Sequence, residues 1–212
     1  MEALSVLIRH SPVPISDLLH RAFPAVVHHA LVSSDSAILS NSCEVLRCYL
    51  FSAVDQVLAW HDDEGNNGIG YMLHVTARLL DPTGPMEWSS PGGRLVTALL
   101  ARVPLESVGL GETTDLLLRA TLARLSTLPS MEAMKASAGL SSTLEVSPVG
   151  VAGARQSLLV VFLLLLHSRT EATLDFLTQV PDAQGQPALG FLLTLWCRLQ
   201  HLFSSPAHIK LR

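Results

Sequence analysis

The tightest cluster of polar chemistry in this 212-residue sequence is the run His61-Asp62-Asp63-Glu64. Its carboxylates and imidazole could hold a divalent cation, or they could attract a basic partner. The calcium-loop spacing D-x-[DN]-x-[DN]-G is absent, which argues against a metal site. An exposed acidic turn that contacts only solvent is the structural alternative. We take Asp62, Asp63 and Glu64 as the candidate contact for a basic partner.

Two other groups of residues could carry chemistry, and neither completes a catalytic or cofactor pattern. Gly65, Gly68 and Gly70 invert the dinucleotide-binding spacing and follow a predicted helix instead of a strand. Cys43 and Cys48 are about 140° apart around a predicted helix, so their thiolates cannot reach one metal ion. No H-E-x-x-H or G-x-S-x-G motif is present. The sequence therefore predicts no enzyme, no cofactor and no bound metal.

The composition excludes several classes of protein. A chain that is 49% hydrophobic, 15% charged and only 5% aromatic is not disordered, and it favours leucine-rich helices over a β-sandwich or barrel. The net charge is −4, and the basic residues are scattered singly, so no nucleic-acid surface is predicted. Three cysteines cannot form an even disulfide framework, so Cys43, Cys48 and Cys197 are predicted to be reduced core residues.

The apolar runs in the sequence are short for a membrane-spanning helix. The longest uninterrupted one, Leu158 to Leu166, has nine residues, whereas a spanning helix needs roughly 20. The first residues, 1–8, lack the basic start and cleavage site of a secretory signal. The sequence therefore predicts no membrane segment and an intracellular location.

Apolar residues recur at three- and four-residue spacing through most of the chain, which predicts a succession of helices separated by turns. An acidic turn is expected at 61–68, between two of these helices. The predicted helices cover residues 15–20, 22–31, 36–60, 69–80, 88–103, 112–125, 155–167, 170–179 and 187–203.

From residue 22 onward these helices group into consecutive antiparallel pairs that begin at intervals of roughly 40–60 residues. A period of about 40–47 residues with two helices each is typical of HEAT and armadillo repeats. In such repeats each helix pair buries its apolar face against the next pair. The sequence thus predicts an all-α, HEAT/armadillo-like α-solenoid of antiparallel helix pairs, with an irregular helical bundle as the alternative.

One stretch interrupts this pattern. Residues 134–153 are rich in Ser, Gly, Ala and Val and lack a helical period. We therefore expect HEAT-like repeats at 1–131 and 154–203, a flexible insertion at 132–153 and a divergent tail at 204–212.

The run CEVLRCYLFSAVDQVLAWHDDEGNNGIGYMLHVTARLLDP, from Cys43 to Pro82, resembles the carboxy-terminal HEAT repeats of the importin nine branch of the importin-beta (karyopherin-beta) nuclear transport receptors. AFPAVVHHAL precedes this run, and GRLVTALLARV, LLRATLARL and PALGFLLTLWCRLQHLF follow it, in the same order and similar spacing as in that branch. The resemblance covers most of residues 1–131 and 155–203. It implies a fragment of a receptor, because Met1 falls inside what would be a repeat.

The resemblance implies a function in nuclear import, with the chain present in both cytoplasm and nucleus. It implies very basic cargo proteins, such as histones and ribosomal proteins, and no direct contact with nucleic acid or membrane. It also implies that the GTPase Ran binds the intact receptor through amino-terminal repeats that this sequence lacks. A HEAT-repeat scaffold or adaptor outside nuclear transport is the alternative.

Overall fold

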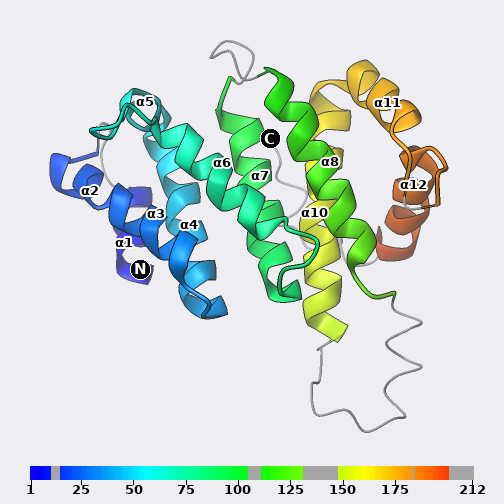
Figure 1. Cartoon of the computed structure of the whole chain (residues 1–212), viewed down its shortest axis with the longest axis horizontal. Helices are drawn as coiled ribbons and strands as arrows, with labels where there is room; N and C mark the ends of the chain where they lie inside the picture. Colours follow the sequence, from blue (N-terminus) through cyan, green and yellow to red (C-terminus); the bar gives the residue numbers. More distant parts are fainter. Residues whose placement is uncertain (11–14, 105–110, 131–147, 183, 201–212) are drawn as a thin grey trace, which may run out of the picture.

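The computed structural model describes residues 1–10, 15–104, 111–130, 148–182 and 184–200 (Figure 1). Within these ranges the chain forms helices and turns without a strand, which confirms the predicted all-α solenoid. The helices are α1 (Glu2–His10), α2 (Asp17–Arg21), α3 (Phe23–Val32), α4 (Ser36–Ser52), α5 (Val54–Ala59), α6 (Gly68–Leu79), the short 3-10 helix η1 (Met86–Trp88), α7 (Ser89–Arg102), α8 (Gly111–Thr127), α10 (Pro148–Ser168), α11 (Thr170–Gln179) and α12 (Ala188–Leu199).

The helices lie in two rows, as expected for stacked helix pairs. α3 pairs with α4, α6 with α7, α8 with α10 and α11 with α12, which are the pairs predicted from the sequence. The second helices of successive pairs also pack on one another, so that α1, α4, α7 and α10 form a continuous row (Figure 1). The most extensive contact joins α7 to α10. Each pair therefore buries its apolar face against its neighbours.

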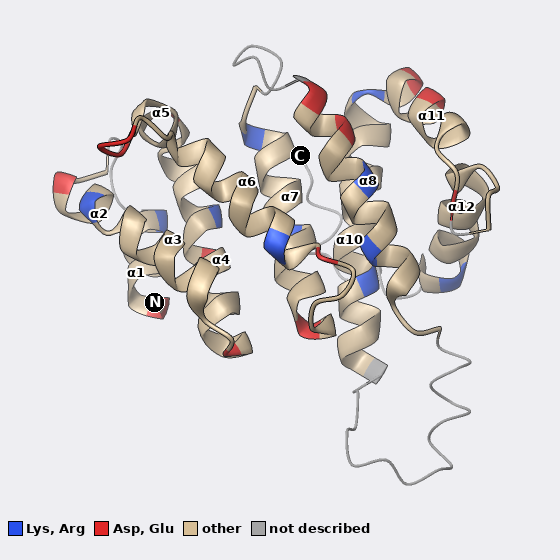
Figure 2. Ribbon diagram, in the orientation of Figure 1, with Lys and Arg blue, Asp and Glu red and all other residues tan. Residues whose placement is uncertain are grey.

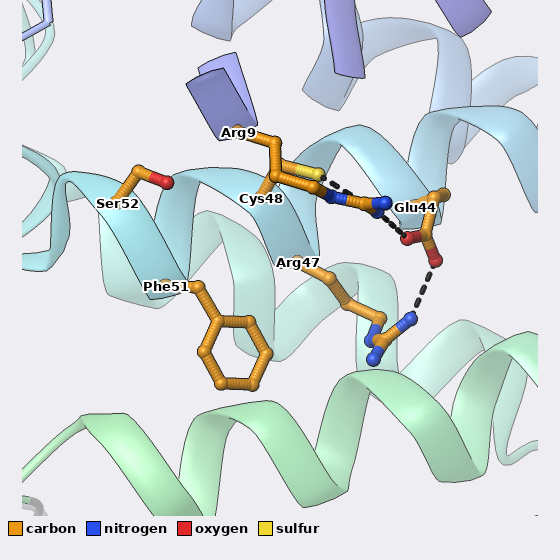
Figure 3. Close-up of a pocket in the computed structure, with 6 residues that line it drawn as sticks. All are labelled: Arg9, Glu44, Arg47, Cys48, Phe51 and Ser52. Atoms are coloured by element: carbon orange, nitrogen blue, oxygen red, sulfur yellow. Dashed lines mark hydrogen bonds and ion pairs between the residues drawn. The ribbon is translucent and has the colours of Figure 1, made fainter. Parts of the chain in front are cut away.

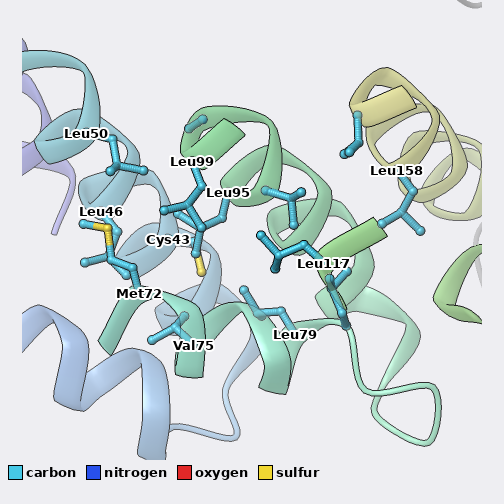
Figure 4. Close-up of a cluster of buried hydrophobic side chains, with 14 of the residues drawn as sticks. Cys43, Leu46, Leu50, Met72, Val75, Leu79, Leu95, Leu99, Leu117 and Leu158 are labelled. Atoms are coloured by element: carbon cyan, nitrogen blue, oxygen red, sulfur yellow. The ribbon is translucent and has the colours of Figure 1, made fainter. Parts of the chain in front are cut away.

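A leucine-rich core runs along the solenoid between the two rows (Figure 4). Each of its residues is at most 9% exposed. Its members include Cys43, Leu46 and Leu50 from α4, Met72, Val75 and Leu79 from α6, Leu95 and Leu99 from α7, Leu117 from α8 and Leu158 from α10. Because each internal pair contributes to the interfaces on both of its sides, the core is continuous along the described repeats.

Arginines connect successive repeats by binding backbone carbonyls. Arg78 on α6 donates hydrogen bonds to the carbonyl oxygens of Ala30, at 2.6 Å, and Ser33, at 2.7 Å, in the preceding pair. Arg124 on α8 makes equivalent contacts to the loop between α6 and α7. Arg102 at the end of α7 donates to the carbonyl oxygen of Phe51 at the end of α4, at 2.9 Å. A planar guanidinium with several donors can join two loops in a way that a lysine ammonium cannot.

The predicted helix 36–60 is instead two helices. The break falls at the buried residue Ala53, whose φ of −149° and ψ of 36° are not helical. The bend redirects α5, which ends next to Trp60, and the Trp60 ring packs on Phe23 at 5.4 Å between centroids. No proline or glycine marks the break, so local sequence did not reveal it.

The expected flexible insertion at 132–153 is wrong in its last six residues, because α10 begins at Pro148. Val151 is fully buried and Ala154 nearly so, and this burial stabilises a helical turn that Gly150 and Gly153 disfavour by propensity. Residues 131–147 and the tail 204–212 lie outside the described residues.

The prediction that no segment could span a membrane is also corrected in one respect. Residues 149–168 of α10 form a helix that is long and apolar enough to do so, with a mean hydropathy of 2.0. Its uninterrupted apolar run is only nine residues long, because Ser157 and His167 bound that run. Packing argues for a core helix: α10 contacts α7, α8, α11 and α12, and Arg155 in its middle donates to the carbonyl oxygen of Leu128.

The last described helix also differs in detail from the prediction. Leu193 and Trp196 on α12 are 44% and 40% exposed, although both are large apolar residues at helical spacing. Leu192, Leu195 and Leu199 form the buried stripe instead. Cys43 and Cys48 are buried as predicted, whereas Cys197 on this helix is exposed, so its assignment to the core is wrong.

Candidate functional site

The acidic run lies in the turn that connects α5 to α6, at the edge of the solenoid (Figure 2). The turn is closed by an antiparallel bridge between His61 and Asn67 and by a hydrogen bond from the Gly68 amide to the carbonyl of Trp60, at 3.0 Å. Asn67 caps α6 by accepting the Gly70 amide at 2.6 Å. The predicted turn at 61–68 is therefore confirmed as an ordered structure.

The carboxylate of Asp62 organises this turn. One oxygen accepts the backbone amides of Glu64, at 3.0 Å, and Asn66, at 2.8 Å. The other accepts the side-chain amide of Asn66 at 2.9 Å and the Tyr71 hydroxyl at 2.5 Å. Aspartate side chains commonly stabilise turns by accepting hydrogen bonds from nearby backbone amides. Both carboxylate oxygens of Asp62 are thus engaged inside the protein.

These hydrogen bonds change the acidity of both side chains. Donation from Tyr71, and then from Asn66, lowers the pKa of Asp62 from 3.8 to about 2. The same contact with the Asp62 carboxylate raises the pKa of Tyr71. Asp62 therefore carries a negative charge that stabilises the turn itself.

Asp63 and Glu64 differ from Asp62 in their surroundings. Both side chains are exposed, and neither carboxylate makes a hydrogen bond or ion pair with any residue that the structure describes. The three predicted site residues are close together, but only two of them offer free carboxylates to a partner. The geometry therefore assigns Asp62 a structural role and leaves Asp63 and Glu64 as the candidate contact.

The same turn occurs a second time, between α11 and α12. Asp182 accepts the backbone amides of Gln184, at 2.8 Å, and Gln186, at 2.9 Å, as Asp62 does with residues 64 and 66. A bridge joins Pro181 to Pro187. Gly185, with φ +76°, takes the left-handed position that Gly65 takes in the first turn, with φ +85°.

The second turn shows which residues the turn geometry requires and which it does not. The pattern D-x-x-G recurs at an offset of 120 residues, and it also occurs at Asp81–Gly84, where the glycine does not have positive φ. At the positions of Asp63 and Glu64 the second turn has Ala183 and Gln184. The turn therefore does not need acidic residues at these two positions.

Aromatic rings lie behind the acidic turn and hold it in place. Trp60 packs edge-on against Tyr71, at 5.8 Å between ring centroids, and against Phe23, at 5.4 Å. Phe23 in turn packs on Tyr49, at 5.3 Å. In a chain with few aromatic residues, this series links the turn to the core between α3 and α4.

The pH dependence of stability tests the role of Asp62. Its folded-state pKa, about 2, lies below the ordinary value of 3.8, so its contribution to stability is present above that value and is lost as pH falls through 2. We expect Asp62→Asn to be less stable than the wild type at neutral pH, with the difference closing between about pH 4 and pH 2. Urea unfolding across this range is the measurement. Asp63→Asn is the control and should show no such difference; a gap for Asp62→Asn that persists at pH 2 would contradict the assignment.

Isolated histidines and buried cysteines do not add a second site. His28, His29 and His74 are exposed, and among the described residues no three His, Cys, Asp or Glu side chains are placed to hold a metal ion. Burial raises the pKa of the Cys43 thiol to about 12, so this cysteine is not a nucleophile at neutral pH.

Comparison with known proteins identifies a relative with a similar sequence. No family model matches the chain. Importin-9 of Drosophila melanogaster is 27% identical over 206 residues, which cover 96% of this chain. The chain spans only 18% of the length of that relative. Over nearly its whole length this chain is therefore similar to a segment of an importin, which confirms the resemblance that its sequence indicated.

Proposed function

We propose that this chain is part of a nuclear import receptor and that it contributes to the capture of basic cargo. The observation that carries the proposal is the similarity to importin-9 along 96% of the chain. The two-row solenoid of helix pairs supports it, because stacked repeats present extended binding surfaces.

The proposed cargo is a very basic protein, such as a histone or a ribosomal protein. The chain has a net charge of −4, and Asp63 and Glu64 are exposed on an ordered turn. Oppositely charged surfaces of this kind act mainly by raising the association rate. In the intact receptor, Ran-GTP would bind amino-terminal repeats, and the receptor would move between cytoplasm and nucleus.

A binding measurement on the full 212-residue chain tests this proposal. We expect a labelled core histone dimer to bind at low ionic strength and to be released as salt rises, because exposed charges are screened over about 8 Å at physiological salt. An acidic protein of similar size is the control and should not bind. Equal binding of both proteins, or binding of neither, would favour a HEAT-repeat scaffold outside nuclear transport.

A further inference from the structure

A pocket of about 310 Å³ lies on the row of second helices, away from the acidic turn (Figure 3). Arg9 from α1 forms one wall, and α4 forms the remainder with Glu44, Arg47, Cys48, Phe51 and Ser52. This volume is at the lower end of the range for ligand pockets, and it suits individual side chains of a partner.

The pocket has an excess of positive charge. Glu44 accepts hydrogen bonds from Arg9, at 2.7 Å, and from Arg47, at 2.5 Å, so one carboxylate is shared by two guanidinium groups. The charges of these three residues sum to +1. Arg102 adds a further positive charge at the edge, where its guanidinium lies 5.4 Å from the centroid of the Phe51 ring.

The donors of the two arginines are not all used. The Nε of Arg47 is buried and has no hydrogen-bond partner, although its Nη1 binds Glu44. The Arg9 side chain is 57% exposed beside it. Arginine binds carboxylates best when two of its N–H groups act together. The Arg47 side chain is 26% exposed, so its terminal nitrogens, and not its buried Nε, are the donors open to a second carboxylate.

An aromatic surface adjoins these donors. Phe51 is 47% exposed, which is unusual for a phenylalanine in a chain whose other described phenylalanines are mostly buried. In Figure 3 its ring and the guanidinium of Arg47 lie along the same side of α4. An acidic side chain next to an apolar one would match this arrangement in both charge and polarity.

We propose that this pocket binds an acidic segment of a partner protein, with a carboxylate held between Arg9 and Arg47 and an adjacent apolar side chain on Phe51. The pocket is opposite in charge to the acidic turn, so the two sites would recognise different partners. Glu44 occupies the arginines when the pocket is empty and competes with the incoming carboxylate.

The test uses a fluorescein-labelled peptide of alternating Glu and Phe residues, with the full chain, read by fluorescence anisotropy. We expect the peptide with Gln in place of Glu to bind at least about tenfold more weakly, because the charged hydrogen bonds are lost. Arg47→Gln should weaken binding of the Glu peptide by a similar factor. Arg21→Gln, an exposed arginine on α2, is the matched control and should leave binding unchanged.

Glu44→Gln gives the sharpest result, because it should tighten binding of the Glu peptide by removing the competing carboxylate. A merely structural role for the Arg9–Glu44–Arg47 network predicts instead that Glu44→Gln and Arg47→Gln weaken binding together. That result, or equal affinity for the Glu and Gln peptides, would overturn the proposal. So would binding of a phosphoserine peptide without binding of the Glu peptide, because the pocket would then select phosphate. Circular dichroism and thermal unfolding of each variant report whether it is folded.

Discussion

Replacing Arg124 with methionine should lower the free energy of unfolding by about 3–5 kcal/mol. Arg124 is only 2% exposed, and none of the described carboxylates forms an ion pair with it. Its Nε donates to the Ser89 hydroxyl at 2.7 Å. Its two terminal nitrogens donate to the carbonyls of Asp81, at 2.8 Å, Pro82, at 3.1 Å, and Pro85, at 2.5 Å.

The size of this effect follows from the groups that the substitution leaves behind. Methionine fills part of the volume but donates no hydrogen bond, so the buried Ser89 hydroxyl and three partly buried carbonyls lose their donor. A buried acceptor without a partner costs about 1–3 kcal/mol. The loop between α6 and α7 would also lose its connection to α8. Burial lowers the pKa of Arg124, but the group stays charged at neutral pH because arginine titrates far above it.

Urea unfolding followed by circular dichroism measures the change. Arg119→Met on the same helix is the matched control, since Arg119 is exposed and lies 5.6 Å from the centroid of the Phe176 ring. A contact of this kind is worth about 0.5–1 kcal/mol. Arg124→Lys should restore only part of the loss, because one ammonium cannot reach all four oxygens. A loss below about 1 kcal/mol for Arg124→Met would show that these contacts do not hold the repeats together.

Replacing Gly93 with alanine should destabilise the chain by about 1–3 kcal/mol, although alanine is the better helix former. A Cβ atom at Gly93 would lie 2.3 Å from the Ser157 Oγ and 2.7 Å from the backbone carbonyl of the same residue. Helices α7 and α10, which make the most extensive contact in the solenoid, would have to move apart. The Ser157 hydroxyl donates to the carbonyl of Ser90 at 2.7 Å, and this hydrogen bond would be lost as well.

Gly190→Ala is the matched control for this prediction. Gly190 is also inside a helix, α12, but a Cβ there would meet nothing within 4 Å. The same substitution should therefore stabilise the chain there, by up to about 1 kcal/mol. The two variants should shift the thermal midpoint in opposite directions. A stabilised Gly93→Ala would mean that α7 and α10 do not pack this closely.

The sequence predicted the elements of this fold better than it predicted its connections. Helical periodicity is local, so α6, α8 and α11 lie close to their predicted bounds. The bend at Ala53 depends on tertiary packing, and no proline or glycine near it predicts a break in the helix. The start of α10 was missed for the same reason, since Val151 is fully buried there and burial is not a local property of the sequence.

The candidate site could be located from the sequence, but the sequence did not show which of its acidic residues is structural and which are free. Composition marks residues 62–64 as one acidic cluster, and only hydrogen bonding distinguishes Asp62 from Asp63 and Glu64. The D-x-x-G at Asp182 repeats the spacing at Asp62, but the same spacing at Asp81–Gly84 makes it an unspecific signal. The role of Arg124 had no such signal, because its acceptors are backbone carbonyls, which every residue carries.

The association rate with a labelled core histone dimer, measured by stopped-flow fluorescence, tests the proposed function most directly. The double variant Asp63→Asn, Glu64→Gln should associate several-fold more slowly than the wild type at low salt, and the difference should shrink at physiological salt. The control variant Glu112→Gln, Asp115→Asn removes the same charge from exposed positions on α8, and it should have a much smaller effect. Equal slowing by both variants, or no slowing by either, would contradict the account, because the acidic turn would then be solvated surface without a part in cargo capture.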